Sequence, residues 1–259
     1  MSRRALAIWG LLLGTVLLFF ALPLLAIGWR GAGGFGAALR DPTVFAALRL
    51  SLVTSLVSTG LSILVGTPLG WVLATKPFRG RALLETFIEL PIVLPPAVAG
   101  IGLLMAFGRR GLLGQWLAPL GLEIVFTPAA VVLAQSFVAA PLYIRAAISA
   151  FRAVDPRWPQ VAATLGASPW RIFWQITLPL AGPGLFGGVL LCWARALGEF
   201  GATIMVAGSF AGRTQTMPLA IYASLERDLN VALALALLLI ALTFLLLLLL
   251  RLLTRLEHA

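Results

Sequence analysis

The chain has little of the chemistry on which most active sites depend. Its 259 residues include one cysteine and one histidine, Cys192 and His258, and its only lysine is Lys76. A single cysteine excludes an internal disulfide and a metal site built from several cysteines, and a lone histidine near the C-terminus argues against a histidine-based active site. No lysine follows a glycine-rich loop, so a phosphate-binding loop of the Walker type is absent. Any ATP that drives this protein must therefore be bound by another chain.

Charged residues are also scarce, at 11% of the chain, whereas 61% of the residues are hydrophobic and the mean hydropathy is +1.03. A soluble domain has about half apolar and about a quarter charged residues. The composition therefore predicts a polytopic membrane protein. The formal net charge is +10, which in a soluble chain would suggest nucleic acid binding. Here most basic residues lie in short loops between apolar segments, so we interpret the charge as a determinant of membrane topology.

Six apolar segments are long enough to cross a membrane, which predicts an all-α bundle of six transmembrane helices. The first exceeds the roughly 7–15 apolar residues of a signal peptide, so we expect a retained helix within residues 1–30; cleavage is the alternative. Residues 30–43 are Gly-rich and predict a connection. With both termini in the cytoplasm, the loops and termini place ten basic residues inside and seven outside, a mild bias. The predicted spans are residues 5–29, 50–75, 83–108, 127–150, 183–208 and 231–250.

The third predicted span contains three prolines, which must break its helical hydrogen bonds. Irregular backbone within a membrane is tolerated where protein buries it or where it lines a cavity. Glu85 and Glu89 precede the break, and we interpret them as carboxylates favoured near a helix N-terminus. In the second span, Gly66 and Gly70 permit the close approach of another helix, although such pairs also arise by chance. The prolines are Pro91, Pro95 and Pro96.

Residues 155–179 form the longest segment that is neither a predicted span nor of disordered composition. Asp155 and Pro156 are typical of a helix start, and Gly166 is typical of a helix end. The dipeptide Ser168-Pro169 then predicts the start of a second helix. We therefore expect two short helices in this segment.

The second of these helices is expected to be amphipathic. Its aromatic face lies opposite Arg171 and Gln175, which predicts a helix at the level of the membrane headgroups. The residues of the aromatic face are Trp170, Phe173, Trp174 and Thr177.

The segment resembles the cytosolic motif of the permease subunits of ABC importers. In that family Glu-Ala-Ala is followed by Gly four positions later and by Ile-x-Leu-Pro ten positions after the Gly. This chain keeps the spacing, the Gly and the closing residues, whereas Gln160 and Val161 depart from the opening Glu-Ala. The resemblance implies a type-1 ABC importer transmembrane domain at residues 46–252, whose coupling segment 155–179 docks on an ATPase subunit; an ordinary cytosolic loop is the alternative. The residues expected to couple to the ATPase are Gln160, Ala162, Gly166, Ile176, Leu178 and Pro179.

The fifth predicted span carries two opposite charges, Arg195 and Glu199, which are four residues apart and are expected on one helix face. An unpaired charge at the centre of a membrane costs about 2.5–3.5 kcal/mol on insertion scales, so both must face protein or water. Two alternatives for Arg195 and Glu199 have equal weight: the two charges only neutralise each other within the helix bundle, or they take part in a transport path. Gly198 and Gly201 are expected to leave nearby backbone uncovered, and Thr203 adds a hydroxyl. These five residues are the candidate translocation pathway.

This stretch resembles the branch of the permease family that imports tetrahedral oxyanions. Gly-Glu-Phe-Gly-Ala, which recurs in that branch, is matched at residues 198–202. Thr203-Ile204 and residues 94–96, 108–111 and 212–218 look like the molybdate type more than the sulfate type. The resemblance covers about residues 46–250, so the first span looks like an addition to a five-helix core.

The resemblance implies a permease subunit that catalyses no reaction and has no cofactor of its own, since ATP is bound by the partner. Its implied partners are a second copy of the chain, two cytosolic ATPase subunits and an extracytoplasmic oxyanion-binding protein, in a bacterial or archaeal plasma membrane. Molybdate is the expected solute, with tungstate close to it. A sulfate or thiosulfate permease is one alternative, and a secondary anion transporter that needs no ATPase is another.

Overall fold

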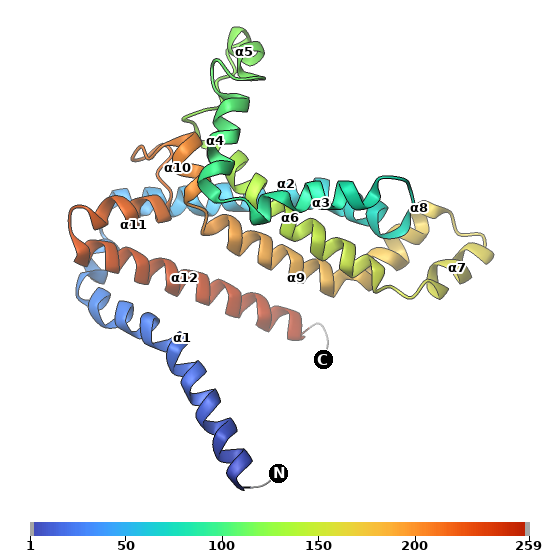
Figure 1. Ribbon diagram of the computed structural model, residues 1–259, viewed down its shortest axis with the longest axis horizontal. Coiled ribbons are helices and arrows are strands. Elements are labelled where there is room, and N and C mark those ends of the chain that lie inside the picture. The colour runs from blue at the N-terminus through green and yellow to red at the C-terminus, as the bar shows by residue number, and fades with distance from the viewer. Residues whose placement is uncertain (1–2, 257–259) are drawn as a thin grey trace. The chain divides into compact units, whose positions relative to one another are not determined.

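The computed structural model describes residues 3–256, so His258 lies outside the described residues. Within that range the chain forms helices and turns and no strand, as predicted. It divides into two compact units, one made of the residues up to Ala47 and from Met217 onward, the other of Leu48–Thr216 (Figure 1). In chain order the helices are α1 (Arg3–Ala38), α2 (Pro42–Thr75), α3 (Arg81–Val93), α4 (Pro96–Phe107), α5 (Gly114–Leu117), η1 (Ala118–Leu120), α6 (Pro128–Arg152), α7 (Arg157–Thr164), α8 (Pro169–Ile172), η2 (Phe173–Thr177), α9 (Leu178–Leu197), α10 (Gly201–Ala207), α11 (Met217–Leu225) and α12 (Leu229–Leu256).

In the first unit, α1 packs along α12, and α11 packs against α12. The predicted Gly-rich connection at residues 30–43 was wrong as far as Ala38, because α1 continues to that residue. A Cβ atom at Gly31 would lie 2.6 Å from the carbonyl oxygen of Leu233, and one at Gly34 would lie 3.2 Å from the Cβ of Ala234. Glycine therefore lets the two backbones approach closely, and this packing offsets its poor helix propensity.

Helix α2 begins at Pro42, eight residues before the predicted start at Leu50. The Asp41 carboxylate accepts hydrogen bonds from the Thr43 hydroxyl at 2.7 Å and from the Thr43 backbone N–H at 2.8 Å. These hydrogen bonds lower the pKa of Asp41. Asp41 is thus an N-cap, and Pro42 occupies the first helical position, where its missing N–H does no harm.

In the second unit, α6 packs against α3, α4, α9 and α10. A Cβ at Gly66 would lie 2.7 Å from the Tyr143 ring, and one at Gly70 would lie 2.7 Å from the Cβ of Ala147. The predicted close approach at these two glycines of α2 is therefore confirmed, and the helix that approaches is α6.

The predicted break in the third span is also confirmed. Helices α3 and α4 are separated at Leu94 and Pro95, and their axes are bent by 112°. Pro95 and Pro96 explain the break, because neither residue can donate a backbone hydrogen bond to the turn before it.

The fifth span differs from the prediction of a helix over residues 183–208. A helical run begins at Pro169, continues through η2 and ends at Leu197. The residues Gly198, Glu199 and Phe200 then interrupt it, and α10 is a separate short helix. The second short helix of segment 155–179 is therefore continuous with α9.

Among the described residues, four helices are long and apolar enough to span a membrane, and the bent pair α3–α4 makes a fifth candidate. Helix α12 contains the apolar stretch Leu229–Leu245. The count of six spans therefore stays a prediction.

Candidate functional site

The segment between α6 and α9 begins with α7, whose two ends are fixed by local hydrogen bonds. The Asp155 carboxylate accepts a hydrogen bond from the backbone N–H of Arg157 at 2.9 Å. At the other end Gly166 has a φ of +82°, in the left-handed region. The N–H of Ala167 donates to the carbonyl of Ala162 at 3.0 Å, and the N–H of Gly166 donates to that of Ala163 at 3.0 Å. This pattern is the Schellman motif, so the predicted role of Gly166 as a helix end is confirmed.

Helix α7 and its C-cap residue Leu165 present an apolar face that the described residues of the chain leave exposed. Trp158, Val161 and Leu165 recur at helical spacing and are 61%, 55% and 82% exposed. Gln160 is exposed, whereas Ala162 is buried. The helix is thus held by its small residue and exposes large apolar side chains on another face, which is unusual for a chain that has no partner there.

The second short helix opens as predicted, because the Ser168 hydroxyl accepts a hydrogen bond from the N–H of Arg171 at 3.4 Å. Thr177 of the predicted aromatic face is buried. Of the predicted coupling residues, Ile176 and Leu178 are half-buried and Pro179 is exposed. The segment from Phe173 to Thr177 is a π-helical turn that leads directly into α9. Turns of this kind occur frequently at functional sites.

An aromatic cluster attaches this helix to the bundle. The Phe173 ring centroid lies 5.0 Å from that of Trp71 in α2 and 6.2 Å from that of Phe151 in α6. Trp170 and Trp174 contact Phe173 from the other side and are 71% and 49% exposed. The predicted aromatic face is therefore partly an internal anchor, and its position at the headgroups stays a prediction.

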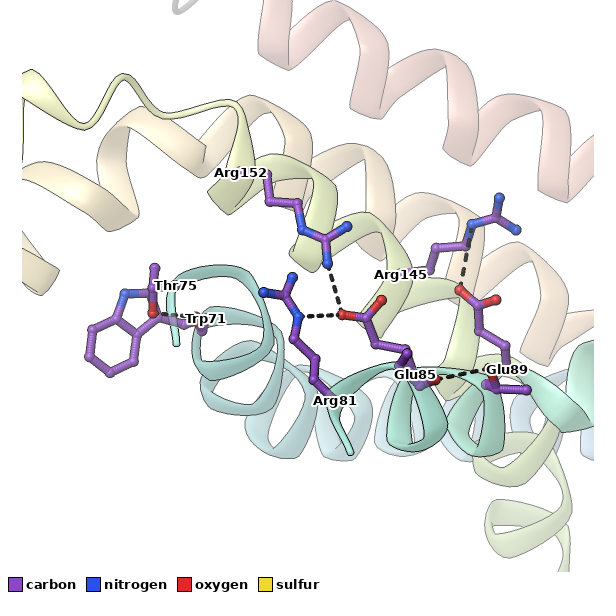
Figure 2. Close-up of polar contacts among 9 residues, drawn as sticks. Trp71, Thr75, Arg81, Glu85, Glu89, Arg145 and Arg152 are labelled. Carbon is purple, nitrogen blue, oxygen red and sulfur yellow. Dashed lines mark hydrogen bonds and ion pairs between the residues drawn. The ribbon is translucent and has the colours of Figure 1, made fainter. Parts of the chain in front are cut away.

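Two ion pairs join α3 to α6 close to this segment (Figure 2). The Oε1 atom of Glu85 lies 2.8 Å from Arg81 Nε in its own helix and 2.8 Å from Arg152 Nη2. The Oε1 atom of Glu89 lies 3.8 Å from Arg145 Nε. Our interpretation of both glutamates as residues that only complement a helix N-terminus was wrong, because neither lies in the first turn of α3 and both face arginines of α6.

The sequence carried a signal for these pairs that we did not use. Glu85 and Glu89 are four residues apart, and Arg145 and Arg152 are seven apart, so each pair lies on one face of its helix. Two acidic and two basic residues at helical spacing in neighbouring apolar helices indicate an interhelical contact.

At the interruption after α9, Arg195 and Glu199 form an ion pair with 2.6 Å between Nη1 and Oε2. The predicted pairing is present, but Glu199 lies beyond the end of the helix and does not share a helical face with Arg195. The Glu199 side chain is 1% exposed and that of Arg195 is 32% exposed. The second carboxylate oxygen, Oε1, accepts a hydrogen bond from the N–H of Ala202 at 2.7 Å. Glu199 therefore both neutralises the arginine and binds the first turn of α10.

The two interrupted helical runs meet at this point. A Cβ at Gly201 would lie 2.8 Å from the Cβ of Pro96, and one at Gly100 would lie 2.7 Å from the carbonyl oxygen of Ala202. The expected uncovered backbone is thus found at Gly198, which is exposed, but Gly201 is covered by α4. Thr203 is fully buried. Among the described side chains, no group of three or more His, Cys, Asp and Glu residues could hold a metal ion.

Comparison with known proteins identifies relatives over most of the chain. The family model described as "Binding-protein-dependent transport system inner membrane component" matches residues 66–257. The molybdenum transport system permease protein ModB of Mycobacterium bovis is 46% identical over 221 residues, which cover 84% of this chain and 83% of the relative. ModB of Escherichia coli K12 is 42% identical, with 73% and 82% coverage. The sulfate transport system permease protein CysW of Synechocystis is 37% identical, with 80% and 76% coverage.

Solved structures show the same fold at low sequence identity. A bacterial ABC transporter involved in the import of alginate matches with a TM-score of 0.74 at 18% identity, over 98% of this chain and 96% of the other. The methionine ABC transporter MetNI matches with a TM-score of 0.65 at 19% identity, over 83% and 97%. The matched family model and the relatives together show that this multi-pass membrane chain belongs to the inner-membrane components of binding-protein-dependent transport systems.

Proposed function

We propose that this chain is the membrane-spanning permease subunit of an ATP-driven importer of a tetrahedral oxyanion, most simply molybdate. It works as a homodimer with two cytosolic ATPase subunits and an extracytoplasmic binding protein. The chain crosses the membrane six times, and the bent pair α3–α4 and the helix α12 are two of these spans. Both termini lie in the cytoplasm.

The observation that carries this proposal is the exposed apolar face of α7. Among the described residues, Trp158, Val161 and Leu165 are left exposed, and an amphipathic helix with such a face is suited to a groove on a partner. Gly166 ends this helix, and it lies at the position of the glycine in the coupling motif of ABC importers. An ATPase subunit is the partner that this arrangement supports, since the chain has no phosphate-binding loop of its own.

The solute is inferred from the relatives. Those named as molybdenum transport permeases are 42–46% identical to this chain, whereas those named as sulfate transport permeases are 34–37% identical. Molybdate is therefore the first candidate. Tungstate follows because the two dianions have nearly the same size and charge, and sulfate or thiosulfate is the alternative.

The test is co-purification of the chain with candidate ATPase subunits, comparing the native sequence with Gly166→Arg. The matched control is Gly121→Arg, because Gly121 has a φ of +72° and, like Gly166, has no neighbouring atom within 4 Å of an added Cβ. Both substitutions thus impose similar backbone strain. We expect Gly166→Arg to abolish binding of the ATPase and Gly121→Arg to retain it. Equal binding by both variants, or no binding by the native chain, would contradict the proposal.

A further inference from the structure

Four buried side-chain atoms among the described residues lack a hydrogen-bond partner, and two of them belong to one residue. Both the amide nitrogen and the amide oxygen of Gln135 are unpaired, and the residue is 0% exposed. The hydroxyl groups of Thr203 and Thr216 are the other two. Unpaired polar groups are rare in protein interiors and especially costly in a membrane, where no solvent can compensate for them. An unpaired buried amide within α6 therefore indicates that this side chain binds a ligand.

Thr203 is unpaired for an identifiable structural reason. Buried hydroxyl groups elsewhere donate to the carbonyl four residues earlier in their own helix, as Thr54, Thr59 and Ser62 do in α2. The residue four positions before Thr203 is Glu199, which precedes the start of α10. The interruption between α9 and α10 therefore leaves this hydroxyl without its usual acceptor.

Helix register places Gln135 at the same interruption. Val131, one turn before Gln135, belongs to a buried cluster with Ala202 of α10. Ala139, one turn after Gln135, belongs to a cluster with Ala196 of α9. Residues four apart lie on one side of a helix. Gln135 is therefore level with the segment that joins Ala196 to Ala202, and this segment contains Glu199.

We propose that Gln135 is a solute-contacting residue of the membrane passage, where its amide, together with the Thr203 hydroxyl, donates hydrogen bonds to an oxyanion that passes the interruption between α9 and α10. This inference rests on the proposed function and adds a residue from a third helical element to the pathway. The –NH₂ group of glutamine offers two donors, and a tetrahedral oxyanion offers only acceptors. The amide oxygen accepts hydrogen bonds from water that accompanies the solute.

The charges near Gln135 favour the passage of an anion over its retention. Arg195 is already paired with Glu199 at 2.6 Å, so the local charge is close to neutral and a dianion is not held by a free guanidinium. Neutral donors bind an anion well enough to replace part of its hydration and weakly enough to release it, which is the requirement for conduction through a passage.

The test is import into vesicles by the reconstituted complex of this chain with its ATPase and binding protein, with molybdate, tungstate and sulfate as probes. Gln135→Met keeps the approximate side-chain volume and removes the hydrogen-bond donor and acceptor groups, whereas Gln135→Glu keeps the shape and adds a repelling charge. Gln115→Met is the control, because Gln115 is exposed in α5. The number of oxyanions imported per ATP hydrolysed is expected to fall about tenfold in Gln135→Met, the loss of one hydrogen bond to a charged solute, and further in Gln135→Glu. It is expected to be unchanged in the control.

The melting temperature separates binding from packing. Removal of an unpaired buried amide is expected to leave the melting temperature of Gln135→Met equal to or above that of the native complex. A marked decrease would show that the amide has partners needed for packing, and an unchanged import ratio in both variants would show that no solute contacts it; either result overturns the inference. If Gln135→Met does not assemble, the import ratio of Gln135→Glu decides. If the native complex imports none of the three oxyanions, the proposed function fails, and this inference fails with it.

Discussion

The carboxylate of Glu199 makes two contacts, one through each of its oxygen atoms. One carboxylate oxygen pairs with Arg195 at 2.6 Å and the other accepts from the Ala202 N–H at 2.7 Å. Because the Glu199 side chain is buried and the Arg195 side chain is one-third exposed, loss of either partner has unequal consequences. Without Arg195 the charge stays buried, whereas without the carboxylate Arg195 retains access to solvent.

This asymmetry predicts the result of a double-mutant cycle. Arg195→Met alone is expected to lower the free energy of unfolding by about 3 kcal/mol, the low end for breaking a buried pair because the Ala202 amide remains. Glu199→Gln is expected to cost less, and the double variant less than the sum of both. Denaturant unfolding of the detergent-purified chain measures this, with the exposed Arg171→Met as control. Strict additivity would show that the two side chains are not coupled.

The same double variant decides between the two roles left open by the sequence. If Arg195→Met with Glu199→Gln leaves both oxyanion uptake and coupled ATP hydrolysis unchanged in a reconstituted complex, the pair is only structural. A selective loss of uptake would instead place it in the passage.

At the scale of elements, local signals in the sequence were sufficient wherever the structure depends on neighbours in the chain. Asp155, Gly166 and Ser168 fixed the ends of the two short helices, and Pro95 with Pro96 fixed the break between α3 and α4. These residues act through their own dihedral angles or through hydrogen bonds that span a few residues, so no knowledge of the fold was needed.

The sequence was insufficient wherever distant segments decide the outcome. Gly31 and Gly34 read as a connection because their packing against α12 lies about two hundred residues away in the chain. The end of α9 at Leu197 was missed because an apolar composition continues past it, although Gly198 and Gly201 flank the interruption. In the candidate site, the pair Arg195–Glu199 was foreseen from spacing, whereas the ion pairs of α3 with α6 and the unpaired Gln135 depend on tertiary contacts.

Helix α3 illustrates how ion pairs can position an element that buries little. No residue of α3 is buried, and its polar link to α6 runs through Glu85 and Glu89 (Figure 2). Arg152 lies in the last turn of α6, three residues before Asp155. We therefore expect a displacement of segment 155–179 to reach α3 through the Arg152–Glu85 contact.

Glu85→Gln is expected to loosen α3 without unfolding the chain. The pair is partly exposed, so the free energy of unfolding should change by less than about 1 kcal/mol. Amide hydrogen exchange across Arg81–Val93 should become faster, because the helix loses one of its two ion pairs with α6, that of Glu85 with Arg152. The control is Glu123→Gln, which removes the more exposed pair with Arg109 and should leave exchange in α3 unchanged. Unchanged exchange in Glu85→Gln would show that the Glu85 ion pairs are not needed to hold α3 against α6.

At the scale of the whole molecule, one helical run of the second unit connects the end of segment 155–179 with the interruption before α10. The run from Pro169 to Leu197 begins in the segment that carries the exposed aromatic residues and ends at the Arg195–Glu199 interruption. A helical run is stiff along its axis, so we expect a movement imposed at its start by a partner to reach its end. The π-helical turn at Phe173–Thr177 is the place where this run departs from regular α-helical geometry, and such turns occur frequently at functional sites.

This arrangement predicts that transport requires the ATPase. In vesicles that contain the chain, the ATPase and the binding protein, molybdate uptake should appear only with ATP, and sulfate should be taken up more slowly. An ion gradient without ATP should drive no uptake. In our proposal the exposed face of Trp158, Val161 and Leu165 binds the ATPase, and the passage opens only when the ATPase moves α7. Uptake by the chain alone under an ion gradient would contradict the importer and support a secondary transporter, whose intramembrane charges Arg195 and Glu199 would then be its coupling residues. Faster uptake of sulfate than of molybdate would keep the importer and change only its solute.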